Sequence, residues 1–409
     1  MMDTASPRGG RPLTSLLPAL ALLGLSGIAL RIPILAVPPL LPLIHHDFHM
    51  SETQVGALVG MPLALFAIAA VPGSLLVARF GARTTLLGGL LIAAFASGAR
   101  GMADGLWMLY LASMLMGLGV AVMQPALPRL VREWVPERIA LGTVVYSNGM
   151  MLGALIPIAL TFPLVMPLVD QNWRFDFLVW AVPVLLVAVL LAVAMPKMPR
   201  GETQAHMPDK WWPDWKSPLI WMLGLTFASN NSMYFALNGM LPDFLTETGR
   251  PELIGSALLW LNLSQIVALV LMPWIAHKLL HRAWPYLVCG PLALLGVVGI
   301  AFLDGTWVLA SATLTGVASA ITFGPTLALA PALSLPNDAH RTAAGTFTIA
   351  YGCAVIIPVL CGALWDYSGI ARLALVPIGL CSVGLTVFGA AMSRFKPARP
   401  AGAMAAAQA

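Results

Sequence analysis

The sequence predicts an all-α integral membrane protein with twelve transmembrane helices, arranged as two pseudo-symmetric six-helix bundles. Its composition and an internal repeat both predict this fold class. Of the 409 residues, 59% are hydrophobic and 10% are charged, against about 45–50% and about 25% in soluble proteins. Because a spanning helix uses about 20 apolar residues, this composition allows roughly twelve spans. It excludes a soluble enzyme.

The first apolar run could be mistaken for a cleavable signal peptide. Arg8 and Arg11 precede it, and Ala19–Ala21 resembles a cleavage site. The run nevertheless continues to Ile44, whereas the apolar region of a signal peptide has about 7–15 residues. We therefore expect it to be the first transmembrane helix.

Charged or Gly/Pro-containing turns divide the chain into twelve apolar runs. A polar interval from Lys197 to Ser217 separates the sixth run from the seventh. The predicted spans are 13–44, 52–78, 84–103, 106–131, 139–168, 174–195, 218–246, 253–280, 284–303, 306–334, 341–365 and 371–393. The predicted domains are an N-terminal tail (1–12), a bundle (13–195), a linker (196–217), a second bundle (218–393) and a C-terminal tail (394–409).

Lys and Arg residues predict the orientation, because they favour the cytoplasmic side of a bacterial inner membrane. With both termini inside, the outer segments contain only Arg174, Arg250 and Arg372. The remaining loop and tail cations are all inside, so the formal charge of +5 is a topology signal and not evidence for nucleic acid. The inside set is Arg8, Arg11, Arg79, Arg83, Arg129, Arg132, Arg138, Lys197, Arg200, Lys210, Lys216, Lys278, Arg282, Arg341, Arg394, Lys396 and Arg399.

The two halves repeat at an offset close to 200 residues. Leu41-Pro42 recurs as Leu241-Pro242, and Asp104-Gly105-x-Trp107 recurs as Asp304-Gly305-x-Trp307. Two parallel six-helix repeats are the plan of secondary transporters whose substrate binds at mid-membrane between the halves.

These features resemble the major facilitator superfamily over residues 13–394. Arg79, Phe80, Gly81 and Arg83 match the family's inside signature after the second span, but Ala78 replaces its usual Asp. The resemblance implies the family's fold and transport by alternating access, with Arg79 and Arg83 as gating residues. The replaced acid argues against the family's usual inside gate in this chain.

A narrower resemblance is to the cyanate and nitroimidazole transporter branch. Prolines follow Arg31 in span 1, Arg100 ends span 3, and the remaining matches lie in spans 4, 7 and 8. They are Pro33, Pro38-Pro39-Leu40-Leu41-Pro42, Gly117, Gly119, Gln124, Pro128, Asn230, Tyr234, Leu241-Pro242-Asp243-Phe244, Gln265 and Met272-Pro273. Related permeases of this branch move different small solutes, so the resemblance does not select a substrate.

Arg31 is the strongest candidate for a substrate-binding residue. It lies midway in span 1, where an ionised Arg costs about 2.5–3.5 kcal/mol on insertion scales. Its guanidinium stays protonated and offers five donors to a small anion. The alternatives are a salt bridge to a neighbouring span or capping of backbone carbonyls. Pro33, Pro38 and Pro39 predict a kink beside it, for packing or for exposing backbone groups to a cavity.

A polar stripe on span 7 is the second candidate. Asn230, Tyr234 and Asn238 are spaced i, i+4 and i+8, so they share one helix face, and Asn231 occupies the repeat position of Arg31. Such a stripe faces either a cavity or a hydrogen-bonded neighbouring helix. The substrate-binding candidates are Arg31, Gln124, Asn230, Asn231, Tyr234, Asn238, Asn262 and Gln265.

Other conspicuous residues favour simpler interpretations. Arg100 is expected near the outer end of span 3, where it snorkels or forms a gate or second anion contact. Gly149, Gly153 and Pro157 suggest close helix packing, although they also resemble an antiporter signature. His45, His46 and His49 with Asp47 form an outer cluster expected to be solvated, with metal binding or pH sensing as alternatives. The four cysteines are expected to be core residues.

No nucleophile elbow, phosphate loop or His-Glu-x-x-His motif occurs, so we expect no catalysis, no cofactor and no metal. The prediction is a monomeric secondary transporter of a small anion or polar solute such as cyanate. The alternatives are an exporter of nitroimidazole-like heteroaromatics and a membrane enzyme or sensor. Uniport, exchange and proton coupling through an acid at the end of a span all remain open.

Overall fold

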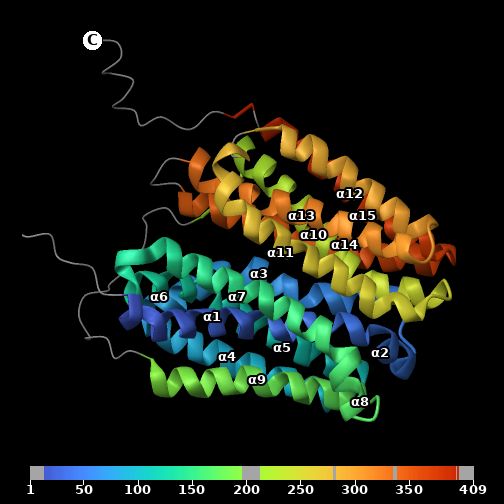
Figure 1. The fold of residues 1–409 in the computed structure, drawn as a ribbon, viewed down its shortest axis with the longest axis horizontal. Coiled ribbons are helices and arrows are strands. Elements are labelled where there is room, and N and C mark those ends of the chain that lie inside the picture. The colour runs from blue at the N-terminus through green and yellow to red at the C-terminus, as the bar shows by residue number, and fades with distance from the viewer. Residues whose placement is uncertain (1–12, 196–211, 280–281, 335–338, 393, 396–409) are drawn as a thin grey trace, which may run out of the picture.

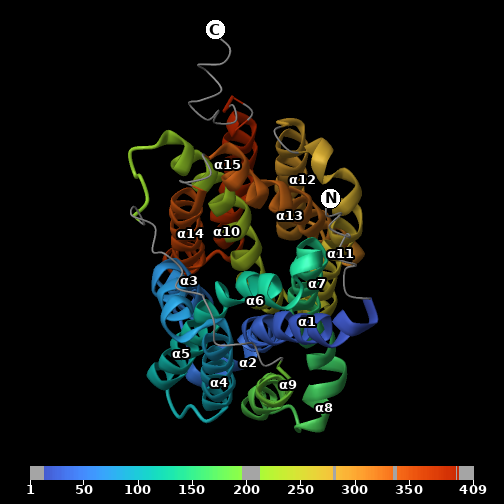
Figure 2. The ribbon, with the colours of Figure 1, turned by 90° about the vertical axis from the view of Figure 1, so that its left-hand side faces the viewer.

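The computed structural model describes residues 13–195, 212–279, 282–334, 339–392 and 394–395, and the regular structure within them is entirely helical. The helices α1 to α9 form one half and α10 to α15 form the other, and Figure 2 shows one half above the other. The predicted all-helical fold is confirmed, apart from the exact count of twelve membrane spans. The predicted N-terminal tail, linker residues 196–211 and tail residues 396–409 lie outside the described part.

The first half contains six helical runs, several of them broken into shorter segments. Its elements are α1 (Leu13–Leu35), η1 (Pro38–Leu40), α2 (Leu41–Phe48), α3 (Glu52–Phe80), α4 (Ala82–Gly101), α5 (Leu106–Met123), α6 (Ala126–Trp134), η2 (Pro136–Arg138), α7 (Ile139–Leu160), η3 (Thr161–Val165), α8 (Met166–Leu168) and α9 (Trp173–Ala194).

The second half repeats this arrangement with fewer breaks. Its elements are α10 (Pro218–Glu247), η4 (Pro251–Leu253), α11 (Ile254–Leu279), α12 (Trp284–Phe302), α13 (Thr306–Leu333), α14 (Ala339–Ser368), η5 (Ala371–Leu375) and α15 (Val376–Met392). Helical segments thus occupy all twelve predicted intervals. Within the described residues, nine segments are long and apolar enough to cross a membrane.

Proline explains the break in the first helical run. α1 ends at Leu35, and Pro38 and Pro39 open the short η1 turn before α2 begins at Leu41. Since proline lacks a backbone N–H and clashes with the preceding turn, an uninterrupted α-helix cannot pass through this stretch. The predicted kink is confirmed. It leaves the carbonyl of Pro33 available to a side chain from another helix.

The helices start and end at two opposite ends of the bundle, which need separate names. In Figure 1, α2 and α8 lie at the end opposite to the start of α1. We call the end with α2 and α8 the distal end, and the end at which α1 starts the terminal end. The distal connections are His49–Ser51, Met102–Gly105, Val169–Asn172, Thr248–Arg250, Leu303–Gly305 and Gly369–Ile370.

Small residues bring helix pairs close together in the first half. A Cβ atom on Gly149 would collide with the carbonyl of Gly24, and one on Gly153 would collide with that of Ile28. These contacts join α7 to α1, as expected where glycines line a helix contact in a membrane. The packing interpretation of Gly149 and Gly153 is therefore the one that the geometry supports.

The halves meet along two helix pairs. α3 packs along α14, and α7 packs against α11. Near the distal end, a Cβ atom on Gly56 would collide with the carbonyl of Pro358, and one on Gly362 would collide with that of Glu52. The distal parts of α3 and α14 are therefore in backbone contact, so the halves are closed against each other at this end.

Candidate functional site

Arg31 lies four residues before the end of α1 and faces the opposite half. Its side chain is partly exposed, and its Cζ atom lies 5.8 Å from the centroid of the Phe235 ring on α10. Among the described residues, no hydrogen bond or ion pair engages its guanidinium. The salt-bridge and carbonyl-capping alternatives for Arg31 therefore find no support in the described part of the chain.

A hydrogen-bonded network from α10 and α11 lies beside Arg31. The Tyr234 hydroxyl donates to Asn262 Oδ1 over 2.5 Å, and Asn262 Nδ2 donates to Asn238 Oδ1 over 2.8 Å. Gln265 and Arg31 both act on the environment of the Tyr234 hydroxyl. Because Arg31 belongs to the first half and the network to the second, the group spans the interface between the halves.

The predicted stripe on α10 divides between two environments. Tyr234 and Asn238 join the network with Asn262, while Asn230 Oδ1 accepts a 3.5 Å hydrogen bond from Thr322 on α13. The Nδ2 atoms of Asn230 and Asn231 are buried and have no partner among the described residues. Asn230 therefore faces α13 within the second half.

Gln124 is also separate from this network. It is partly exposed and lies at the break between α5 and α6. No hydrogen bond joins it to the residues around Arg31 in the described structure. Its place at the end of a glycine-containing helix explains why it was a candidate, but the geometry supplies no contact to the network.

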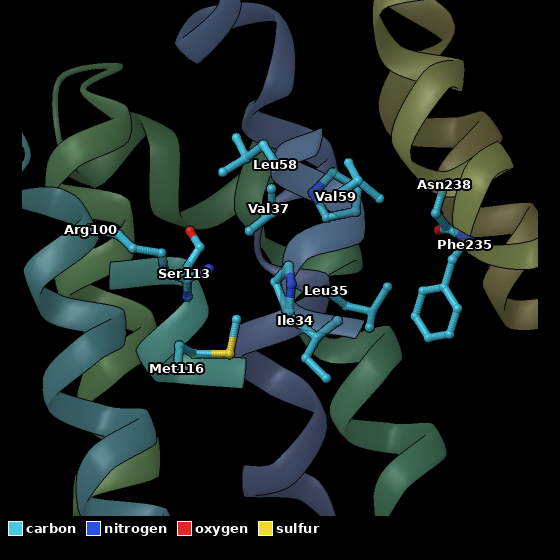
Figure 3. Close-up of a pocket in the computed structure, with 12 residues that line it drawn as sticks. Ile34, Leu35, Val37, Leu58, Val59, Arg100, Ser113, Met116, Phe235 and Asn238 are labelled. Atoms are coloured by element: carbon cyan, nitrogen blue, oxygen red, sulfur yellow. The ribbon is translucent and has the colours of Figure 1, made fainter. Parts of the chain in front are cut away.

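A small cavity lies between the halves on the distal side of this group. Figure 3 shows Arg100 and Ser113 on one side of it and Phe235 and Asn238 on the other. Its volume is about 20 Å³, which accommodates roughly one water molecule. A larger solute can therefore enter only if the halves move apart. The other lining residues are Ile34, Leu35, Val37, Pro38, Leu58, Val59, Pro62 and Met116.

Arg100 contradicts the expectation that it snorkels, because its side chain is fully buried. Its Nη2 atom donates to the carbonyl of Pro33 at 2.9 Å and to Ser97 Oγ at 2.6 Å. Its Cζ atom lies 4.4 Å from the centroid of the Phe177 ring. α1 and α9 cover this end of α4, so the side chain cannot reach the surface.

An acid that the sequence analysis overlooked acts electrostatically on Arg100 without forming an ion pair with it among the described residues. Asp176, in the first turn of α9, is fully buried and interacts electrostatically with Arg100. Neither carboxylate oxygen of Asp176 has a hydrogen-bond donor, and Arg100 Nε and Nη1 have no acceptor, within the described residues. Arg100 and Asp176 both belong to the first half, on α4 and α9, and Arg100 also lines the cavity between the halves.

Comparisons with known proteins agree with this architecture. The family described as Major Facilitator Superfamily matches residues 19–359. The chain belongs to the Major Facilitator Superfamily. A bacterial homologue of the human lysosomal transporter Spinster, solved in an inward-facing, occupied conformation, superposes with a TM-score of 0.72 at 17% identity, covering 96% of this chain and 100% of that one. This similarity shows the fold.

Two curated relatives belong to the branch that the motifs predicted. The chain is 26% identical to the 2-nitroimidazole transporter of Escherichia coli (strain K12), covering 90% of this chain and 94% of the relative. It is 27% identical to the cyanate transport protein CynX of the same strain, covering 93% and 97%. The predicted resemblance is confirmed. The protein is a multi-pass membrane transporter of the superfamily, in which small solutes cross by secondary transport.

The two arginines of the superfamily's inside signature lie at the terminal end, on α3 and α4. Arg79 is exposed and lies 5.6 Å from the Phe80 ring, and Arg83 donates to the carbonyl of Ala192 at 3.2 Å. Among the described residues neither forms an ion pair. Arg83 thus ties α4 to the end of α9, as expected if the missing acid at position 78 removes the usual pairing.

The predicted outer histidines divide between two environments. His46 and His49 are exposed, as expected, with ring centroids 6.3 Å apart, while Asp47 forms a 2.6 Å ion pair with Arg174. His45 instead turns towards Glu52 and Asp243, with Nδ1 3.4 Å from Asp243 Oδ2. Sequence analysis missed this group because its members come from three segments. The repeated Leu-Pro motif before Asp243 was the available signal.

Proposed function

We propose that this permease transports a small anion, of which cyanate is the model, and that Arg31 anchors it. The supporting observation is the Arg31 guanidinium, which lies deep in the bundle and, among the described residues, has no hydrogen-bond or ion-pair partner. An uncompensated charge at this depth is costly, and an anion bound beside Arg31 would compensate it. A salt bridge, which was the alternative interpretation of Arg31, would have made such a role unnecessary.

The neighbouring groups suit a small planar solute. The guanidinium donates in a fixed, planar geometry that matches two acceptor atoms of one anion. Tyr234 and Gln265 offer further polar atoms, and Phe235 provides an apolar surface beside Arg31. The side-chain amides of Asn238 and Asn262 donate hydrogen bonds to each other's side chain or to backbone carbonyls. Their proposed role is therefore to hold Tyr234 in position.

A neutral nitroheteroaromatic is the second candidate substrate. Once the halves move apart, the aromatic ring of Phe235 would offer a flat ring an apolar surface, while a nitro group could accept hydrogen bonds from Arg31. The 2-nitroimidazole transporter is among the relatives of this chain. Both candidates use the same guanidinium, but only the anion needs its charge.

The proposed setting is the bacterial inner membrane, with a monomeric protein and both termini in the cytoplasm. The terminal end would then face the cytoplasm and the distal end the outside, as the distribution of Lys and Arg predicts. Residues 13–195 and 218–393 would rock against each other about the central site, joined by the linker 196–217. A C-terminal reporter that is active only outside the cytoplasm would contradict this orientation.

Counterflow in sealed vesicles tests the proposed function. Purified protein is reconstituted into vesicles loaded with unlabelled cyanate, and entry of labelled cyanate is measured with 2-nitroimidazole as a competitor. We expect saturable exchange that Arg31→Gln abolishes, while Arg132→Gln, at an exposed position, leaves it unchanged. Exchange of 2-nitroimidazole that survives Arg31→Gln, without exchange of cyanate, would favour the second candidate. Normal cyanate exchange by Arg31→Gln would refute the anchor.

A further inference from the structure

Three titratable side chains from different segments meet at the distal end. His45 comes from α2, Glu52 begins α3, and Asp243 lies near the end of α10. His45 Nδ1 lies 3.4 Å from Asp243 Oδ2 and 3.9 Å from Glu52 Oε1. One nitrogen or oxygen of each side chain lies within 4.8 Å of the other two. The group therefore joins the first half to the second.

Burial leaves this group short of positive charge. Asp243 is 4% exposed and Glu52 is 9% exposed. Within the described part of the chain, Glu52 Oε2 is buried and has no hydrogen-bond partner, and Asp243 Oδ2 likewise has none, although the His45 ring lies 3.4 Å away. A buried carboxylate without donors or a cation is expensive to keep ionised. Two such carboxylates close together favour a state in which at least one is protonated.

The surrounding elements add negative charge. Asp366 of α14 lies beside Glu52, and Glu247 of α10 also acts on it electrostatically. On α2, Asp47 is already paired with Arg174, and His46 and His49 are exposed. No Lys or Arg among the described residues forms an ion pair with Glu52 or Asp243. His45 is thus the only cationic group that can balance them within the described structure.

The group is intact only while the distal end is closed. Asp366 accepts hydrogen bonds from the backbone N–H groups of Glu52 at 2.9 Å and Thr53 at 2.8 Å, so α14 caps the start of α3. The glycine contacts between α3 and α14 lie directly below this cap. Separating the halves here would move Asp243 away from His45 and Glu52 and would admit water to all three.

We propose that His45, Glu52 and Asp243 form a proton-binding site that latches the distal end shut. In the closed state one proton from the adjacent solution is held among the three side chains. Opening separates and hydrates the carboxylates, so that this proton returns to the solution. Because the closed state binds more protons than the open state, low pH favours closure and high pH favours opening. This inference goes beyond the proposed function and does not depend on the substrate.

A distance measurement without substrate tests the latch. Trp107 on α5 and Tyr367 on α14 are exposed, lie at the distal end and belong to different halves. Spin labels are attached to cysteines at these two positions, after Cys289, Cys353, Cys361 and Cys381 are replaced by alanine. Pulsed electron resonance then gives the closed and open populations of the reconstituted protein between pH 5.5 and pH 8.5.

We expect the ratio of closed to open populations to fall by up to about tenfold per pH unit, the limit for one proton. Glu52→Gln and Asp243→Asn imitate the protonated carboxyls, so each variant should stay closed and lose the pH dependence. His46→Gln changes an exposed histidine on α2, the helix of His45, and this variant should keep the pH dependence. Asp366→Asn should lower the closed population at every pH, but the ratio of closed to open populations should change with pH as in the unmodified protein.

Three results would overturn the proposal. The unmodified protein could show no pH dependence, or the slope could persist in both Glu52→Gln and Asp243→Asn. Alternatively, the populations could respond to added Zn²⁺ and to a chelator but not to pH, which would assign the three side chains to a metal. Because no transport is measured, each result is independent of whether cyanate is a substrate.

Discussion

Arg31 and Arg100 both lie within the membrane-spanning part of the first half, but they differ in burial and in hydrogen-bond partners. Arg100 is fully buried, with Pro33, Ser97, Phe177 and the charge of Asp176 around it. Arg31 is partly exposed and, among the described residues, has no hydrogen-bond or ion-pair partner.

The difference is our reason for proposing a structural role for Arg100 and a binding role for Arg31. A buried ion that has protein partners stabilises only its own surroundings, and removing one partner leaves the other uncompensated. A charge without a protein partner, placed where the two halves meet, can instead be compensated by a solute. We infer that the environment of an intramembrane arginine, more than its depth, decides its role.

The largest expected effect is on stability and concerns Arg100. Arg100→Met should destabilise the protein by about 3–5 kcal/mol, because it leaves Asp176 buried without a counter-charge. Adding Asp176→Leu should restore most of the loss. Thermal unfolding in detergent measures both, with Arg83→Met at a more exposed arginine as the control. Equal stability of Arg100→Met and the unmodified protein would remove the distinction between the two arginines.

The second effect is on binding and concerns Arg31. Arg31→Gln should weaken cyanate binding by about 10- to 100-fold, as expected for lost hydrogen bonds to a charged group, and should not lower the unfolding temperature. Arg31→Lys keeps the charge but loses the planar donor geometry, so we expect a loss of about tenfold. Binding is followed by calorimetry on purified protein. A loss of stability that matches that of Arg100→Met would make Arg31 structural as well.

A smaller effect on cyanate binding is expected at Tyr234, the network residue beside Arg31. Tyr234→Phe removes one hydroxyl, so binding should weaken by about 3- to 10-fold. Tyr367→Phe changes an exposed tyrosine at the distal end and serves as the control. Counterflow rates over a range of cyanate concentrations give the apparent affinity. A Tyr234→Phe variant as impaired as Arg31→Gln would transfer the anchoring role from the arginine to the network.

The smallest effect on binding is expected at Gln124, a candidate that lies away from the network around Arg31. Gln124 has no hydrogen bond to the residues around Arg31, so Gln124→Ala should keep the apparent affinity within about twofold. The same counterflow assay measures it. A large loss would mean that the binding site extends towards the α5–α6 break when the halves move.

The topology of this permease was accessible from the sequence because it depends on local properties. Apolar runs of sufficient length, the prolines after Arg31 and the repeated Asp-Gly-x-Trp turn each determine a helix or a connection without reference to distant residues. The structure places helices in all twelve predicted intervals. The family and the branch also followed from short motifs, and the comparisons confirmed them.

The candidate site was only partly predictable. The spacing of Asn230, Tyr234 and Asn238 placed them on one face, but it could not show that Asn230 contacts Thr322 while the other two join Asn262. The position of Arg100 near a helix end suggested snorkelling. Whether another helix covers that end depends on how α1 and α9 pack, which no local pattern encodes.

The sequence by itself therefore determined the class of protein, the helical intervals and the presence of two arginines that needed an explanation. Only the tertiary structure decided which arginine has a partner, because Asp176 is 76 positions from Arg100 along the chain and meets it through helix packing. The same holds for His45, Glu52 and Asp243, whose meeting requires the two halves to close. Charge compensation depends on how close two groups are in space, within a few ångströms. Periodicity and hydropathy depend only on the order of residues along the chain.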